Sequence, residues 1–203
     1  MSILLTVGFT HLLALMSPGP DLVLVVRNTL SRSKIDGYFT ALGFALGVAC
    51  HLTLGLLGLK LLIDAFPIAL TLLRIGGALY LAYIGLQSWR AGQFQLSAVA
   101  ANSGGDRLRS LREGLVTNLL NTKAMLFFIG LILNVLTPDV ALEVRLAAVL
   151  LMVCLTALWF SLVARFLSIA VVRERFLRWQ KALERLLAVL LWLLALKLSG
   201  LIG

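Results

Sequence analysis

Six apolar stretches of membrane-spanning length constrain this chain more than any other feature of its sequence. A helix needs about 20 consecutive apolar residues to cross the hydrocarbon core of a bilayer. The composition agrees, because 61% of the 203 residues are hydrophobic, only 13% are charged and the mean hydropathy is +1.02. A water-soluble domain of this composition would expose large apolar patches. The sequence therefore predicts an all-α integral membrane protein, with expected spans at Ile3–Val26, Phe39–Leu62, Ile68–Trp89, Gly114–Leu136, Leu146–Val172 and Leu183–Leu201.

A polar, glycine-containing segment divides the six expected spans into two groups of three. Because three is an odd number, the second group enters the membrane from the side opposite to the first. This arrangement is a 3+3 inverted repeat, which is common among transporters. We expect one transmembrane domain, residues 1–203, with a first repeat at 1–90, a cytoplasmic loop at 91–112 and a second repeat at 113–203.

The basic residues predict the orientation of the spans. Thirteen of the 18 Lys and Arg residues lie in the connectors after the first, third and fifth spans, whereas the other two connectors carry only Lys60 and Arg145. By the positive-inside rule, the basic connectors are cytoplasmic and both termini face outward. The net charge of +9 suits an anionic inner leaflet as partner. Nucleic acid is not an expected partner, because these residues occupy short connectors rather than one polar face.

The motif SPGPD interrupts the first apolar span at Ser17, Pro18, Gly19, Pro20 and Asp21. Proline cannot donate a backbone hydrogen bond and disfavours helix in the residue before it. The span is therefore expected to break into two half-helices, the second of which starts near Pro20 with free amide groups that attract anions. Asp21 either caps that start or faces a substrate cavity, and these two roles are compatible.

The fourth expected span contains a matching polar interruption, formed by Asn118, Asn121 and Lys123. Lys123 lies about ten residues, or roughly 15 Å of helix, from the cytoplasmic end of its span, which places it near the midplane. If the two halves are related by symmetry, both breaks meet at the centre and Asp21 shares a cavity with Lys123. The alternative is a purely structural salt bridge between these two residues.

Two histidines lie inside the apolar spans, His11 in the first and His51 in the second. Histidine titrates near physiological pH, so each is a candidate proton carrier together with Asp21. The alternative for each is a neutral side chain packed between helices. His11 lies seven residues before Pro18, about two helical turns, and is therefore expected on the face of the break.

Taken together, these motifs resemble the LysE/RhtB superfamily of bacterial amino-acid exporters. The resemblance rests on SPGPD in the first span, RIGGALYLAYIGLQSWR in the third and NLLNTKAMLFF in the fourth, and it covers almost the whole chain. FTHLLALMSPGPD and the following LSRS are most similar to the threonine/homoserine exporter branch. The chain departs from the family at Thr122, where the family usually has proline between the residues that match Asn121 and Lys123.

The resemblance implies a multi-pass carrier in the bacterial inner membrane, with both termini periplasmic, that exports a small amino acid by proton antiport. The expected partners are the amino acid, protons and lipid, and neither a cofactor nor a bound metal is expected. The carboxylate of a zwitterion suits the half-helix start and Lys123, and its ammonium group suits Asp21. The exported amino acid and the choice between a monomer and a homodimer stay open. The predicted binding residues are Ser17, Pro18, Gly19, Pro20, Asp21, Asn118, Asn121 and Lys123, and the predicted proton-coupling residues are Asp21, His11 and His51.

Two other function classes compete with this interpretation. A divalent-metal exporter of a related superfamily would need several oxygen ligands, and the spans offer one clearly intramembrane carboxylate, Asp21. An intramembrane enzyme would need a paired aspartate, a zinc motif or a serine–base pair. Ser17 with His11 is the only conceivable pair of that kind, so we expect the chain not to be an enzyme.

Overall fold

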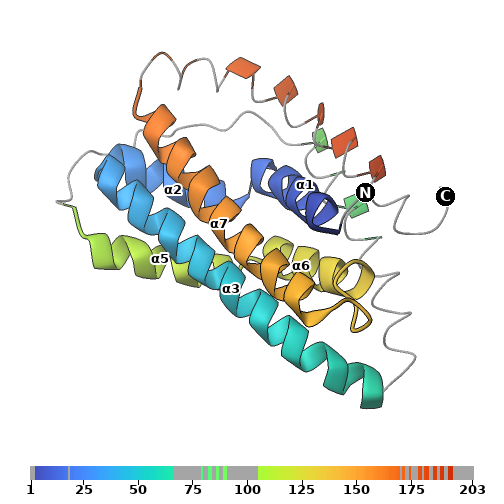
Figure 1. Ribbon diagram of the computed structural model, residues 1–203. Helices are drawn as coiled ribbons and strands as arrows, with labels where there is room; N and C mark the ends of the chain where they lie inside the picture. Colours follow the sequence, from blue (N-terminus) through green and yellow to red (C-terminus); the bar gives the residue numbers. More distant parts are fainter. Residues whose placement is uncertain are drawn as a thin grey trace.

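The computed structural model describes residues 3–17, 19–65 and 105–169, and isolated positions between 79 and 90 and between 171 and 193. The described residues contain no strand, which confirms the all-α class for this part of the chain. The expected spans Ile68–Trp89 and Leu183–Leu201 lie outside the described residues except at those isolated positions. The helices are α1 (Ile3–Met16), α2 (Pro20–Ser31), α3 (Lys34–Ala65), α5 (Arg107–Leu119), α6 (Thr122–Asn134) and α7 (Leu142–Leu167) (Figure 1).

Two of these helices are long and apolar enough to cross a membrane unaided, α3 over Lys34–Gly58 and α7 over Leu142–Leu167. The number rises to four if each of two bent helix pairs counts as one span. Large apolar side chains such as Leu54 and Leu150 are exposed on the outer faces of α3 and α7. Since the backbone of a helix satisfies its own hydrogen bonds, such a surface suits lipid rather than water.

The two bent pairs are α1 with α2 and α5 with α6. The first pair is bent by 61° and the second by 58°. The two pairs run in opposite directions, because the start of α1 packs against α6 and the end of α2 contacts the start of α5. The bends occur where the sequence predicted breaks, at SPGPD and at the Asn-rich segment of the fourth expected span.

Helix α3 is the centre of the helix packing and contacts α2, α5, α6 and α7. It lies close to α5, because a Cβ atom added at Gly43 would come within 2.2 Å of the Leu111 carbonyl oxygen. The same is true in reverse, since a Cβ added at Gly114 would meet the Thr40 carbonyl oxygen at 2.3 Å. Small residues at Gly43 and Gly114 therefore allow the two backbones to touch, a usual device where helices associate in a membrane.

Helices α3 and α7 lie side by side and antiparallel (Figure 1). Phe44, early in α3, packs against Phe160, late in α7, with ring centroids 4.8 Å apart. Later in α3, Leu52 shares a second buried cluster with Met152 of α7 and with Val7 of α1. The first cluster also contains residues of α2, and the second contains residues of α6.

Helix α5 begins at Arg107, inside the segment 91–112 that the sequence predicted to be a loop. The expected start of the fourth span at Gly114 is therefore not the start of the helix. Asp106 caps the helix by accepting a hydrogen bond from the Arg109 amide at 3.0 Å. Arg109 and Glu113 add an ion pair at 2.9 Å with i,i+4 spacing, which favours helix in this charged stretch.

Candidate functional site

The second half-helix of each bent pair carries a charged residue at its second position. Helix α2 starts at Pro20, so Asp21 is its second residue, and α6 starts at Thr122, so Lys123 is its second residue. A carboxylate is favourable at a helix start, whereas an ammonium group there opposes the helix dipole. The position of Lys123 is therefore not explained by the stability of α6.

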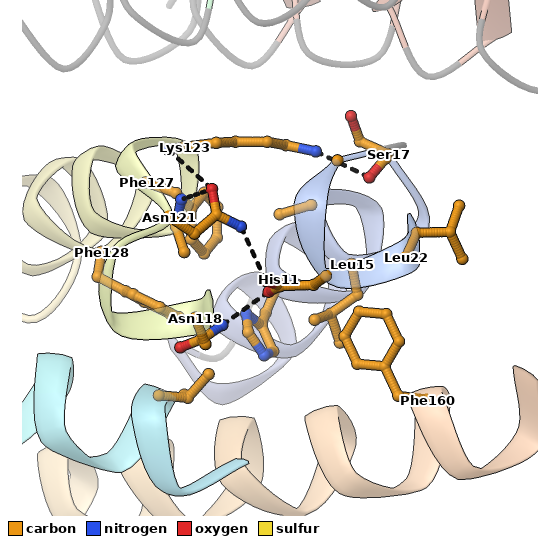
Figure 2. Close-up of a pocket in the computed structure, with 15 residues that line it drawn as sticks. His11, Leu15, Ser17, Leu22, Asn118, Asn121, Lys123, Phe127, Phe128 and Phe160 are labelled. Atoms are coloured by element: carbon orange, nitrogen blue, oxygen red, sulfur yellow. Dashed lines mark hydrogen bonds between the residues drawn. The ribbon is translucent and has the colours of Figure 1, made fainter. Parts of the chain in front are cut away.

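Asp21 is tied to the other break rather than to its own helix. Its carboxylate accepts hydrogen bonds from the Asn118 side chain at 2.7 Å and from the Asn121 side chain at 3.1 Å (Figure 2). Because an ionised carboxylate only accepts hydrogen bonds, both amide groups must turn their nitrogen atoms toward it. Asn121 also caps α6, since its side-chain oxygen accepts from the amides of Lys123 and Ala124 at 3.1 and 3.4 Å.

Lys123 makes the reciprocal contact with the first break. Its Nζ atom donates a hydrogen bond to the Ser17 carbonyl oxygen at 2.8 Å, at the end of α1 (Figure 2). Among the described residues, no ion pair within 4.0 Å joins Lys123 to Asp21. The alternative of a direct structural salt bridge between these two residues is therefore not what this structure contains.

A cavity of about 50 Å³ lies between the two breaks. One buried water needs roughly 10–15 Å³ of such space, so the cavity has room for several waters. Its polar wall is formed by Ser17, Gly19, Asp21, Asn118, Asn121 and Lys123, and its other wall by His11, Ala14, Leu15, Leu22, Val48, Ala124, Phe127, Phe128 and Phe160. Six of the eight predicted binding residues thus line one space. Pro18 lies outside the described residues, and Pro20 is exposed at the first position of α2.

His11 lies on the apolar wall of the cavity and is 1% exposed. Its Nε2 atom is 2.8 Å from the Thr156 hydroxyl of α7, and that hydroxyl donates to the Met152 carbonyl oxygen at 2.8 Å. The ring also packs against Phe127 and Phe128, with centroid distances of 5.8 and 5.7 Å. The sequence predicted that His11 would lie on the face of the break, and in the structure His11 lines the cavity at the break.

The other predicted histidine, His51, is half-buried on α3 and is not among the described residues that line the cavity. Its Nε2 atom donates to the backbone carbonyl of Asn118 at 3.1 Å, because a carbonyl oxygen can only accept. This carbonyl belongs to the last turn of α5 and also accepts a hydrogen bond from the Asn121 amide at 3.1 Å. In this structure His51 therefore supports Asn118, which in turn contacts Asp21.

The break between α5 and α6 is as sharp as the break between α1 and α2, although Thr122 stands where the family usually has proline. Thr122 is the first residue of α6, a position at which proline is also favoured. The first turn is fixed instead by the side chain of Asn121. The departure from the family pattern at Thr122 consequently does not remove the bend.

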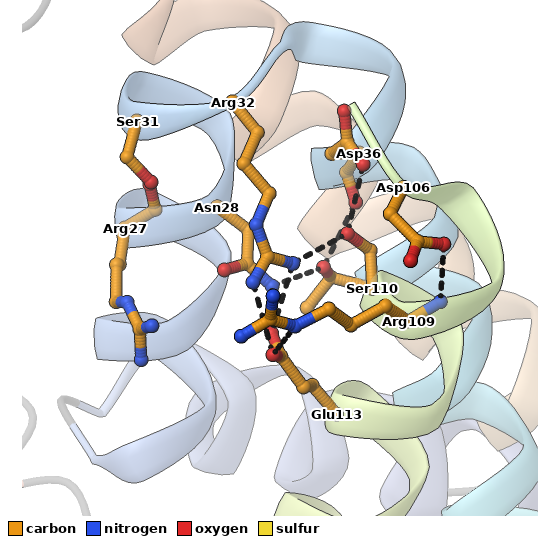
Figure 3. A network of polar contacts seen from close by, with 10 residues as sticks. Arg27, Asn28, Ser31, Arg32, Asp36, Asp106, Arg109, Ser110 and Glu113 are labelled. Atoms are coloured by element: carbon orange, nitrogen blue, oxygen red, sulfur yellow. Dashed lines mark hydrogen bonds and ion pairs between the residues drawn. The ribbon is translucent and has the colours of Figure 1, made fainter. Parts of the chain in front are cut away.

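A charged network closes one end of the helix group, where α2 ends and α3 and α5 begin (Figure 3). Arg32 forms two hydrogen bonds with the Glu113 carboxylate, at 2.9 and 3.0 Å, and a third with the Ser110 hydroxyl at 2.9 Å. Asn28 donates to Glu113 at 3.1 Å, and Ser110 donates to Asp36 at 2.9 Å. The hydrogen bonds to Glu113 raise the pKa of Arg32 above its ordinary value, so the arginine of this network stays charged.

Sequence reasoning missed several residues of the site. Phe127, Phe128 and Phe160 were not distinguishable from other apolar residues of their spans, because all of them fit the same hydrophobic pattern. Thr156 offered one weak signal, a hydroxyl in the middle of a span. Such a hydroxyl usually bonds only to its own helix, so its contact with His11 was not predictable. In the part of the chain that the structure describes, no group of three or more His, Cys, Asp or Glu is placed to hold a metal ion.

Comparison with known proteins gives a family for the chain. Residues 12–200 match the family model of the LysE type translocator. The chain is 34% identical over 189 residues to the threonine efflux protein of Escherichia coli (strain K12), an alignment that covers 91% of both chains. The threonine efflux protein of Salmonella typhimurium is likewise 34% identical with the same coverage. An uncharacterized membrane protein of Escherichia coli (strain K12), YahN, is 30% identical over 97% of this chain and 88% of its own.

No solved structure matches the chain. The family match and these relatives cover nearly its whole length, and they agree with a helical membrane protein. The chain belongs to the LysE family of amino-acid exporters of bacterial membranes.

Proposed function

We propose that this protein exports a small amino acid of the threonine or homoserine type across the bacterial inner membrane by proton antiport. The observation that carries the proposal is the cavity between the two helix breaks, which brings an acidic and a basic side chain to one polar wall. The similarity to threonine efflux proteins supports the substrate class.

In this proposal the two ends of the zwitterion bind to opposite charges of that wall. The substrate carboxylate binds Lys123, in place of the Ser17 carbonyl that now accepts its hydrogen bond. It also binds the amides at the start of α2, which no side chain caps. The substrate ammonium binds the Asp21 carboxylate, which Asn118 and Asn121 hold in place. Because both helix starts are fixed by the fold, the charges are oriented before the substrate arrives.

Proton coupling in this scheme uses the same carboxylate. When Asp21 takes up a proton from the outside, it loses the negative charge that binds the substrate ammonium, and the amino acid is released. Loss of that proton to the cytoplasm restores the charge and allows the next amino acid to bind. One proton thus moves inward for each amino acid that moves outward.

The proposed membrane arrangement treats each bent pair as one broken span. Together with α3, α7 and the two expected spans outside the described residues, this gives six spans in a 3+3 inverted repeat with both termini periplasmic. The network around Arg32 and Glu113 then lies on the cytoplasmic side, where it agrees with the position of the basic connectors. In this proposal the network separates when the cavity opens to the cytoplasm.

The test is transport by the purified protein in liposomes. Vesicles loaded with labelled threonine or homoserine are given an inward-directed proton gradient, and efflux is compared with vesicles that have no gradient. We expect gradient-dependent efflux that Asp21→Asn and Lys123→Met each reduce by at least tenfold. Matched controls are Asp139→Asn and Lys34→Met, which change the same charges at exposed positions and should leave efflux unchanged.

Two results would contradict the proposal. If neither amino acid leaves the vesicles with a proton gradient, the transport function is wrong. If both are exported but the Asp21 and Lys123 variants match their controls, the function stands and the assigned binding residues are wrong.

A further inference from the structure

The apolar wall of the cavity contains one polar atom that no other part of the proposed site uses, the Nδ1 atom of His11. The atom is buried and has no hydrogen-bond partner. A buried polar atom without a partner is costly, and most such atoms in folded proteins are paired. An unpaired atom on the wall of a binding cavity is therefore a candidate for contact with the ligand itself.

The contact between His11 and Thr156 determines what this nitrogen can do. The single hydroxyl hydrogen of Thr156 is directed at the Met152 carbonyl oxygen, so the Thr156 oxygen must accept from His11 at the Nε2 position. In the neutral ring, Nδ1 then carries a lone pair and is a hydrogen-bond acceptor.

The geometry of the ring turns this acceptor away from α7, in a residue that lines the cavity. The two nitrogens of an imidazole point in diverging directions, so with Nε2 held against α7, Nδ1 points away from that helix. Figure 2 shows His11 between the side chain of Asn118 and helix α7. The surrounding wall is apolar, because Phe127 and Phe128 pack on the ring and Leu15 and Phe160 line the same space.

The polar wall of the cavity suits the charged groups that all amino acids share, and the apolar wall is left for the substrate side chain. We infer that His11 Nδ1 accepts a hydrogen bond from a hydroxyl group on that side chain, so that His11, held by Thr156, selects hydroxy amino acids over apolar ones of the same shape. This inference rests on the proposed function, because it assumes that the cavity binds an amino acid. Threonine and valine are the natural pair for the choice, since they differ by a hydroxyl in place of a methyl group.

A second buried atom without a partner, an oxygen near the cavity, is a poorer candidate for this role. The Asn118 Oδ1 atom is also buried without a partner. A Cβ atom added at Gly47 would be only 2.5 Å from this oxygen, so the oxygen points at the backbone of α3. A substrate in the cavity cannot reach it from that side.

The test compares efflux of labelled threonine and valine from liposomes for the wild type, His11→Leu, His11→Gln and Thr156→Val. A polar group left without its partner lowers discrimination by roughly 1–3 kcal/mol per hydrogen bond, so we expect the wild type to prefer threonine by about tenfold or more. His11→Leu should bring the threonine-to-valine ratio close to one while valine is still exported. His11→Gln retains an acceptor oxygen and should keep part of the preference. Thr156→Val releases Nε2 and should lower the ratio several-fold.

Three results would overturn the inference. An unchanged ratio in His11→Leu means that His11 does not contact the side-chain hydroxyl, as would be the case if it bound the ammonium group that both substrates carry. If His11→Leu lowers the efflux of threonine and valine equally and the efflux no longer depends on the proton gradient, His11 carries the proton instead. A ratio in Thr156→Val equal to that of the wild type means that Thr156 does not orient the ring.

Failure of the proposed function gives a different result. If the wild type exports neither amino acid, the transport proposal fails, and the role of His11 is then decided by binding alone. Stabilisation of the detergent-solubilised protein by threonine but not by valine, lost in His11→Leu, supports the inference. Equal stabilisation by both amino acids, or by neither, contradicts it.

Discussion

Gly47 of α3 controls a residue of the site without touching the cavity itself. A Cβ atom added there would lie 2.5 Å from Oδ1 and 2.9 Å from Cβ of Asn118. Both distances are shorter than real side-chain contacts allow. Because the Asn118 Cβ is attached to the backbone of α5, no rotation of the side chain alone relieves the contact. Gly47→Ala should therefore displace Asn118 and break its 2.7 Å hydrogen bond to Asp21.

The expected magnitude follows from the nature of that bond. A hydrogen bond to a charged group contributes about 1.5–3 kcal/mol. With about 1.4 kcal/mol for each factor of ten, its loss should lower threonine efflux by about ten- to a hundredfold. Replacing glycine by alanine inside a helix otherwise favours the helix by up to about 1 kcal/mol, so a general weakening of α3 is not expected.

Gly58→Ala is the matched control for Gly47→Ala. It makes the same substitution in the same helix, and no described heavy atom lies within 4 Å of the added Cβ. Efflux from liposomes is measured for both variants, with thermal unfolding in detergent as the check on folding. We expect Gly58→Ala to transport like the wild type and to be at least as stable.

A double-mutant cycle with Asn118→Gly tests the route by which Gly47→Ala acts. The glycine removes every side-chain atom of residue 118 that the new methyl group would meet. If the loss of efflux runs through Asn118, Gly47→Ala should have little further effect in this background. A full tenfold loss in the Asn118→Gly background, or wild-type efflux in Gly47→Ala alone, would refute the reasoning.

Two further predictions concern the charged network and the orientation of the chain. Arg32→Ala should lower the free energy of unfolding by about 2 kcal/mol, less than the ~3–5 kcal/mol of a fully buried pair, because the Glu113 side chain is 25% exposed. Arg27→Ala, which removes an exposed arginine of the same helix, should have little effect, and equal thermal unfolding of the two variants would contradict the prediction. For orientation, single cysteines are introduced at Asp139 and Arg107 in a protein without Cys50 and Cys154. A membrane-impermeant maleimide should label the first in intact cells and the second only after permeabilisation, and the reverse pattern would contradict the proposed topology.

Much of the candidate site was predictable from sequence because an unpaired backbone polar group has a high free-energy cost in hydrocarbon. Two prolines, two asparagines, an aspartate and a lysine inside apolar runs have no stable place facing lipid. Their presence predicted both breaks, and a symmetry relation between the two halves predicted that the breaks share a cavity. The positions of the breaks did not depend on packing details, and both bends occur where these residues lie.

The exact contacts between these residues were not predictable. The sequence predicted that Asp21 and Lys123 share a cavity, with a direct salt bridge as the alternative, but it did not predict their partners. In the structure Asp21 accepts from Asn118 and Asn121, and Lys123 donates to the Ser17 carbonyl. Hydrogen-bond partners depend on distances of a few tenths of an ångström between helices that are far apart in the chain. No periodicity in the sequence carries that information.

Sequence by itself determined that the chain is helical, that it lies in a membrane and that its first and fourth expected spans contain polar breaks. These conclusions follow from the cost of placing polar groups in hydrocarbon, which is a property of each segment alone. Only the tertiary structure decided that His51 supports Asn118 and that Thr156 fixes the ring of His11. Those roles depend on the packing of α3 and α7 against the two breaks, because a side chain gains its function from the atoms that neighbouring helices bring to it.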